Sequence, residues 1–169
     1  MAMIAVACVC AALMLTLLAA MEDVRRYTIS NWIPAALIGL WCVYAPVSGM
    51  GWTAAGLALA TGFGALVLTM ALWAPGWLGG GDAKLLAALA LWFGWPSALT
   101  FVLLAVISGG VLALGLLMLR RYAPGLPVSP AWIASGPLAH GAPVPYGVAI
   151  AAGTFWALPG SALFSSLIL

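Results

Sequence analysis

The sequence predicts an all-α integral membrane protein, a bundle of about six transmembrane helices in one domain spanning residues 1–169. Of the 169 residues, 66% are hydrophobic and 5% are charged, which leaves too little polar surface for a globule in water. The apolar runs are continuous rather than alternating, and this favours helices. Helices also satisfy every backbone polar group in lipid. The lipid bilayer is therefore an expected partner, whereas nucleic acid is not.

Six apolar runs follow one another with short breaks between them. They cover residues 3–20, 32–44, 52–73, 83–95, 98–119 and 144–169. Proline and glycine break the chain after the second and third runs, and Pro96 separates the fourth from the fifth. Residues 120–143 form a long proline-rich connection that holds the only histidine, His140. The first run is expected to stay as a span rather than act as a cleaved signal, because its positive charges follow it.

The positions of the cations predict the orientation of the chain. With six spans, all five cations fall on the same side of the membrane: Arg25, Arg26, Lys84, Arg120 and Arg121. By the positive-inside rule this side is the cytoplasm. The same frame puts Asp23 and Asp82 at one cytoplasmic rim, although they are far apart in sequence.

Asp23 and Asp82 are the residues that suggest chemistry. Glu22 is the only other acidic residue in the chain, and an ionisable group at the edge of a span is a functional candidate by default. Two carboxyl groups brought together share a proton, so that one activates water while the other donates to a carbonyl. The alternatives are structural: Asp82 caps the fourth span, and Asp23 pairs with a neighbouring arginine.

No metal or other cofactor is expected. The three cysteines, Cys8, Cys10 and Cys42, lie inside apolar runs and form no C-x-x-C pair, so a zinc site and a disulfide are both poor interpretations.

Three strings surround the candidate residues. They are Gly79-Gly80-Gly81-Asp82-Ala83-Lys84-Leu85, the segment from Asp23 to Ile29-Ser30-Asn31, and Val144-Pro145-Tyr146-Gly147-Val148-Ala149. In this order they resemble the G-x-G-D-x-K-L signature, the first-aspartate segment and the P-Y-G-x-A stretch of the type IV prepilin peptidases. The short CpaA/TadV-type enzymes associated with Flp or Tad pili are the nearest likeness within that family.

The resemblance implies a membrane aspartyl endopeptidase that removes the leader of prepilins or pseudopilins. It places the enzyme in the bacterial inner membrane, with its active site at the cytoplasmic face. The implied catalytic residues are Asp23 and Asp82. The residues implied to shape the site are Gly79, Gly80, Gly81, Lys84, Asn31, Pro145, Tyr146 and Gly147. Neither the motifs nor the composition indicates an oligomeric state or a particular prepilin.

The sequence differs from the family pattern in two places, and each difference predicts a property of this protein. Longer members resemble bifunctional enzymes with a cysteine-rich cytoplasmic insertion, and this chain has no room for one between its first two spans, so methyltransferase activity is not expected. Ser30 stands where the family often has proline, which is expected to loosen the turn after Asp23.

Two other classes remain as alternatives. One is an intramembrane G-x-G-D protease of the presenilin or preflagellin type, whose wider motifs are not matched. The other is a nonenzymatic bundle, a transporter or an assembly scaffold, that uses its two acids for ion coupling or structure. In a transporter we would expect the acidic residues near the middle of the membrane, within broken helices, whereas Asp23 and Asp82 lie at the edges of spans.

Overall fold

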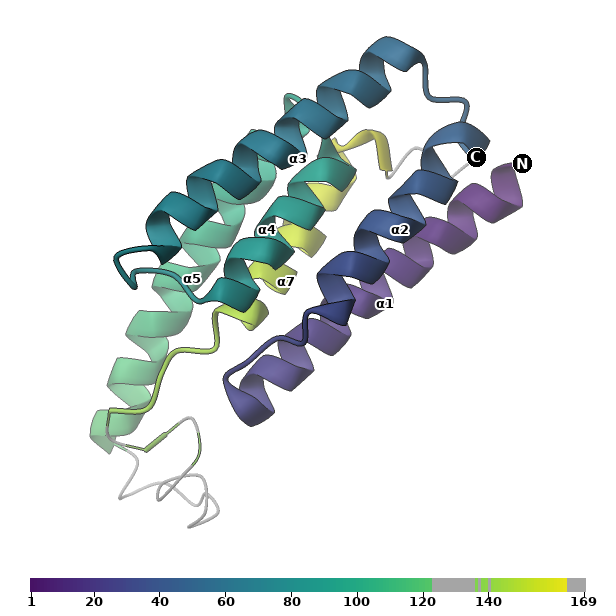
Figure 1. Ribbon diagram of the computed structural model, residues 1–169. Helices are drawn as coiled ribbons and strands as arrows, with labels where there is room; N and C mark the ends of the chain where they lie inside the picture. The colour runs from purple at the N-terminus through teal and green to yellow at the C-terminus, as the bar shows by residue number, and fades with distance from the viewer. Residues whose placement is uncertain (123–135, 137, 140, 164–169) are drawn as a thin grey trace.

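The structure, a computed structural model, describes residues 1–122, 136, 138–139 and 141–163 (Figure 1). His140 and most of the proline-rich connection lie outside these residues. The described part contains helices and no strand, so the all-α prediction is confirmed. The helices are α1 (Ala2–Arg26), α2 (Trp32–Val47), α3 (Trp52–Trp73), α4 (Gly80–Phe93), α5 (Ser97–Tyr122) and α7 (Tyr146–Ala157), followed by the 3-10 turn η2 (Leu158–Gly160).

Two short helices, α4 and α7, form the centre of the bundle. α4 contacts α2, α3, α5 and α7, and α7 contacts α1 as well as α5. Figure 1 shows both short helices between α3 and α5 on one side and α1 and α2 on the other. Most of α4 is buried, including Leu85 and Leu89, whereas few residues of α3 are. The start of α4 and the start of α7 are therefore positioned by helices on several sides.

Glycines allow two of these helix pairs to approach closely. A Cβ atom added to Gly62 of α3 would lie 2.8 Å from the Leu91 Cβ atom of α4. One added to Gly153 of α7 would lie 2.5 Å from the backbone of Ala105 in α5. Small residues serve the same purpose in membrane bundles generally, because they bring helix backbones into contact.

Among the residues that the structure describes, three helices are long and apolar enough to cross a membrane, namely α1, α3 and α5. The other three described helices are shorter, with 16 residues in α2, 14 in α4 and 12 in α7. At 1.5 Å per residue, 12 residues rise roughly 18 Å, less than the ~30 Å of hydrocarbon. The last apolar run therefore differs from the single span expected: α7 ends at Ala157, and Pro159 lies in the 3-10 turn that follows.

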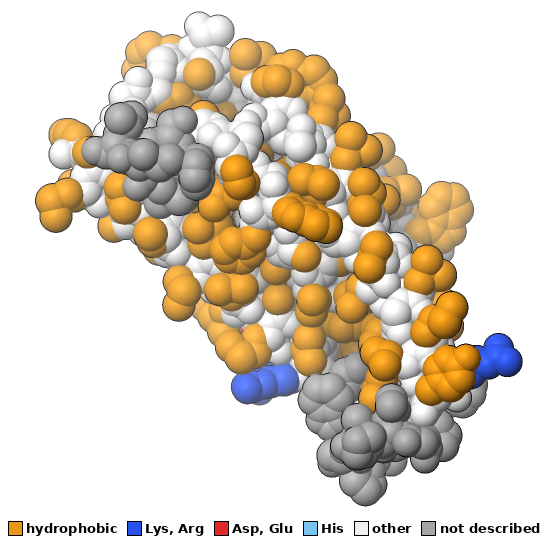
Figure 2. Space-filling view, turned by 180° about the vertical axis from the view of Figure 1, so that it is seen from behind, with side chains coloured by type: hydrophobic (Ala, Val, Ile, Leu, Met, Phe, Trp, Pro, Cys, Tyr) orange, Lys and Arg blue, Asp and Glu red, His pale blue; other side chains and the backbone are white. Residues whose placement is uncertain are grey.

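The outer surface fits a membrane protein. Large hydrophobic side chains are exposed along α3 and α5, for example Phe63 at 70% and Val111 at 66%. Figure 2 shows hydrophobic side chains over most of one face and Lys or Arg only toward one end. The end of α1, the start of α4 and the end of α5, which carry the five cations, lie at the same end of the bundle (Figure 1).

Candidate active site

Asp23 lies in the last turn of α1 and is buried, with 5% of its surface exposed. Its Oδ2 atom accepts a hydrogen bond of 2.7 Å from the backbone N–H of Gly147, at the start of α7. The first N–H groups of a helix have no partner within that helix, so they are available for an acceptor from elsewhere. This bond joins two segments that are 124 residues apart.

The space around residue 147 is too small for any side chain larger than that of glycine. A Cβ atom at this position would lie 2.9 Å from the Asp23 Cβ atom and 3.0 Å from its Oδ2 atom. Any larger residue would push the carboxyl group away from the start of α7. The P-Y-G string is therefore part of the same site as Asp23.

Asp82 lies in the first turn of α4 and is also buried. The capping interpretation is wrong, because the N-cap of α4 is Gly79 and no side chain caps the helix. Within the described residues, the Asp82 Oδ1 atom is buried without a hydrogen-bond partner. The carboxyl group of Asp23 is close enough for its charge to act on Asp82. The end of α1 and the start of α4, which carry the two aspartates, lie at the same end of the bundle (Figure 1).

The three glycines before Asp82 each face a close neighbour. A Cβ atom on Gly79 would lie 2.5 Å from the Asp82 Oδ2 atom, and one on Gly81 would lie 3.2 Å from the backbone N and O atoms of Ile29. A Cβ atom on Gly80 would lie 3.1 Å from the indole nitrogen of Trp73. The φ angle of Gly79 is −67°, which any residue adopts. Space around Asp82, rather than an unusual backbone conformation, explains this glycine.

The connection between α1 and α2, residues 27–31, is fixed at both ends. The Ser30 N–H donates a hydrogen bond of 3.0 Å to the Glu22 Oε2 atom, and the Lys84 Nζ atom donates one of 2.8 Å to the Asn31 Oδ1 atom. A proline in place of Ser30 has no N–H to donate, so the turn is held here by Glu22 instead of by a proline ring. Sequence reasoning missed this role of Glu22, although its position next to Asp23 was a signal.

Lys84 is exposed and binds Asn31 rather than either aspartate. Pro145 is the N-cap of α7 with a φ of −74°. Tyr146 is 40% exposed and, together with Leu78, lines a cavity of about 340 Å³ between α4, α5 and α7. Neither aspartate lines this cavity, although Leu78 directly precedes the three glycines and Tyr146 directly precedes Gly147. All the residues expected to shape the site therefore lie around the starts of α2, α4 and α7.

We expect Glu22→Ala to lower the activity of this site several-fold, because the turn after Asp23 loses its acceptor for the Ser30 N–H. Glu22→Gln keeps an oxygen that accepts this bond, so it is expected to retain most of the activity. Steady-state kinetics of both variants in the same detergent checks this. Equal losses in the two variants would contradict a positioning role through the hydrogen bond.

These observations describe an all-helical membrane protein with two buried carboxyl groups at helix ends on one side of the bundle. The family model described as "Type IV leader peptidase family" matches residues 8–114, which include both aspartates. The chain belongs to the type IV leader peptidase family.

Curated relatives agree with this assignment. The chain is 33% identical over 75 residues to the "Prepilin leader peptidase/N-methyltransferase" of Aeromonas salmonicida, and equally to that of Aeromonas hydrophila. Each alignment covers 38% of this chain and 26% of the relative, so the matched part spans about a quarter of the relatives' length. No solved structure matches the chain.

Proposed function

We propose that this protein is a membrane aspartyl endopeptidase that removes the leader of type IV prepilins, with Asp23 and Asp82 as its catalytic pair. The observation that carries the proposal is that two buried carboxyl groups, from the last turn of α1 and the first turn of α4, lie at the same end of the bundle, where the start of α7 binds one of them. Family membership supports leader peptides as the substrate class.

The two carboxyl groups supply the acid and the base that peptide hydrolysis needs. One carboxylate takes a proton from water as the water oxygen attacks the carbonyl carbon of the scissile bond, and the other carboxyl group donates its proton to the carbonyl oxygen. The resulting diol then collapses, the C–N bond breaks, and a proton passes to the leaving nitrogen. Burial excludes bulk water and strengthens the electrostatic interactions at the site.

The cleavage assay is direct. The purified protein, reconstituted in vesicles with a full-length prepilin, should release the leader and leave a mature N-terminus that mass spectrometry identifies. Intact prepilin after prolonged incubation with well-inserted enzyme would contradict the proposal. Comparing a Flp-type prepilin with a longer type IV prepilin tests the finer proposal that the enzyme serves Flp or Tad pili.

We also propose that the enzyme lacks the methyltransferase function that the names of its relatives include. Residues 27–31 alone join α1 to α2, which leaves no room for an insertion there. Adding S-adenosylmethionine to the same assay should leave the new N-terminus unmethylated, which the product mass reports. A gain of one methyl group would overturn this part.

The active site is proposed to face the cytoplasm. Because all five cations lie at the end of the bundle that holds the aspartates, the positive-inside rule orients that end inward. A cytoplasmic reporter fused after Arg121 is expected to be active, as is a periplasmic reporter fused at Ser48, which follows α2 at the opposite end (Figure 1). The reverse pattern at both positions would put the aspartates outside and contradict cytoplasmic leader removal.

A further inference from the structure

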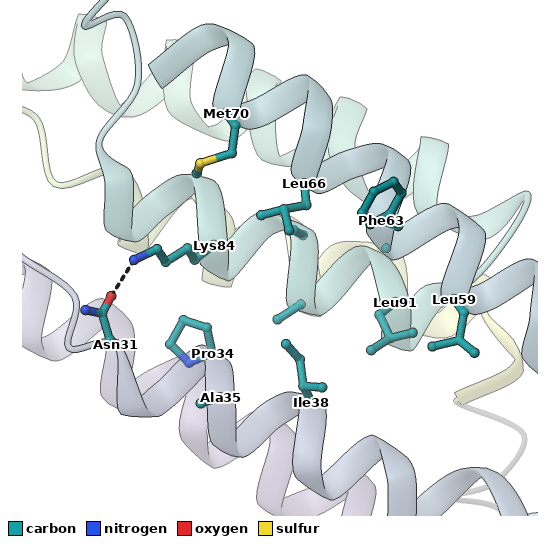
Figure 3. A pocket seen from close by; sticks show the side chains of 13 residues that line it. Asn31, Pro34, Ala35, Ile38, Leu59, Phe63, Leu66, Met70, Lys84 and Leu91 are labelled. Atoms are coloured by element: carbon teal, nitrogen blue, oxygen red, sulfur yellow. Dashed lines mark hydrogen bonds between the residues drawn. The ribbon is translucent and has the colours of Figure 1, made fainter. Parts of the chain in front are cut away.

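A groove between α2, α3 and α4 encloses about 580 Å³ on the flank of the bundle (Figure 3). Its walls are apolar, with Ile38 on α2 and Phe63 and Leu66 on α3, and Leu91 belongs to its floor on α4. Ile38 and Phe63 are exposed, at 46% and 70%. The α2–α3–α4 groove is separate from the contact of Asp23 with Gly147, and the chemistry proposed above does not use it.

One end of the α2–α3–α4 groove is polar. Lys84 and Asn31 lie there, joined by their 2.8 Å hydrogen bond (Figure 3). Asn31 is neutral, and in the described part of the chain no acidic side chain forms a salt bridge with Lys84. An ammonium group has three donors, so the bond to Asn31 leaves donors for another acceptor. An apolar groove thus ends in an uncompensated positive charge at the cation-rich end of the bundle.

We propose that the α2–α3–α4 groove binds one anionic glycerophospholipid. Its phosphate accepts hydrogen bonds from the Lys84 ammonium and the Asn31 amide, and an acyl chain lies between α2 and α3 along α4. Basic pockets between transmembrane helices at the membrane face bind anionic headgroups for the same electrostatic reason. The lipid fills a gap that α2 and α3 leave over the floor formed by α4.

The length and lining of the groove suit an acyl chain. α3 rises about 16 Å between Leu59 and Met70, which both line the groove. Apart from Asn31 and Lys84 at one end, the side chains that line the groove are apolar, so hydrocarbon packs against them without leaving a polar group unpaired.

Native mass spectrometry of the detergent-solubilised protein tests the headgroup. When dioleoyl-phosphatidylglycerol or dioleoyl-phosphatidylcholine is added, the protein should retain one molecule of phosphatidylglycerol and retain phosphatidylcholine less well. Lys84→Gln should weaken this retention about fivefold, whereas Lys84→Arg should keep it. Arg121→Gln removes an exposed cation away from the groove and should leave the preference unchanged. Equal retention of the two lipids, or equal losses in the two Gln variants, would overturn the proposal.

A second pair of variants tests the acyl chain. Ala35 is exposed on α2 and lines the groove, so Ala35→Trp should fill it and abolish specific retention of phosphatidylglycerol. Ala60→Trp adds the same ring to an exposed position of α3 outside the groove and should have no such effect. If Ala35→Trp leaves lipid retention intact but raises the KM for prepilin, the groove belongs to the substrate and the lipid proposal fails. The lipid readout needs no peptidase activity, so it stands apart from the test of cleavage.

Discussion

Asp23→Asn and Asp82→Asn should each lower the rate of leader cleavage by roughly 10³-fold or more, while the protein still inserts and folds. An amide neither takes a proton from water nor donates one to the carbonyl oxygen. When two residues act as one catalytic unit, replacing either of them removes most of the rate enhancement that the pair provides. The double variant should therefore be little worse than either single variant. The measurement is single-turnover cleavage of a prepilin in vesicles.

Glu22→Gln is the matched control for this experiment, because it makes the same carboxyl-to-amide change one residue before Asp23. It is expected to keep most of the activity, since its oxygen still accepts from Ser30. Near-normal cleavage by either aspartate variant would remove that aspartate from the catalytic pair. The protein would then need a different explanation for its two buried acids.

Gly147→Ala should have the second largest effect, a fall of about a hundredfold in kcat/KM. The added methyl group would meet the Asp23 Cβ atom at 2.9 Å, so the carboxyl group must move or α7 must shift. Misplacing a catalytic group by about 1 Å costs this much. The defect should lie in activity rather than in insertion, because Gly147 is at the edge of the bundle's core.

Gly115→Ala is the control for the effect of alanine on a helix. A Cβ atom at Gly115 of α5 meets nothing within 4 Å, and alanine stabilises a helix by up to about 1 kcal/mol over glycine at either position. Gly115→Ala should therefore be fully active and at least as stable as the parent. Normal cleavage by Gly147→Ala would show that the tight contact with Asp23 does not set the geometry of the site.

Most of the fold followed from hydropathy. The helix α3 begins and ends where its apolar run does, at Trp52 and Trp73. Its bounds follow from local hydropathy alone, because apolar residues partition into lipid whatever segments lie beside them. α1 extends to Arg26, six residues past the predicted end of its span, since a helix continues through polar residues at the membrane surface. The last run was harder to predict, because Pro159 and the packing of α7 against α5 decide where that helix ends.

The sequence indicates which residues form the candidate site, but it does not indicate which of their side chains are in contact. Scarcity of charge pointed to Asp23 and Asp82, and their motifs pointed to the glycines. Lys84 and Asn31 were both expected to help shape the site, but the hydrogen bond that joins them was not predicted. The partner of Ser30, Glu22, was not foreseen. Side-chain pairing across helices depends on the rotation of each helix about its axis, which an apolar run does not specify.

Composition and motifs were enough to predict a helical membrane protein whose cations share one end and whose Asp23 and Asp82 lie in motifs that resemble those of the family. These properties depend on local composition and on the cost of burying charge in lipid. The hydrogen bond from Gly147 to Asp23, the burial of both aspartates and the groove between α2, α3 and α4 depend on how the helices pack. Such contacts join residues from distant parts of the chain, and they arise because side-chain volumes and close glycine contacts fix how the helices pack.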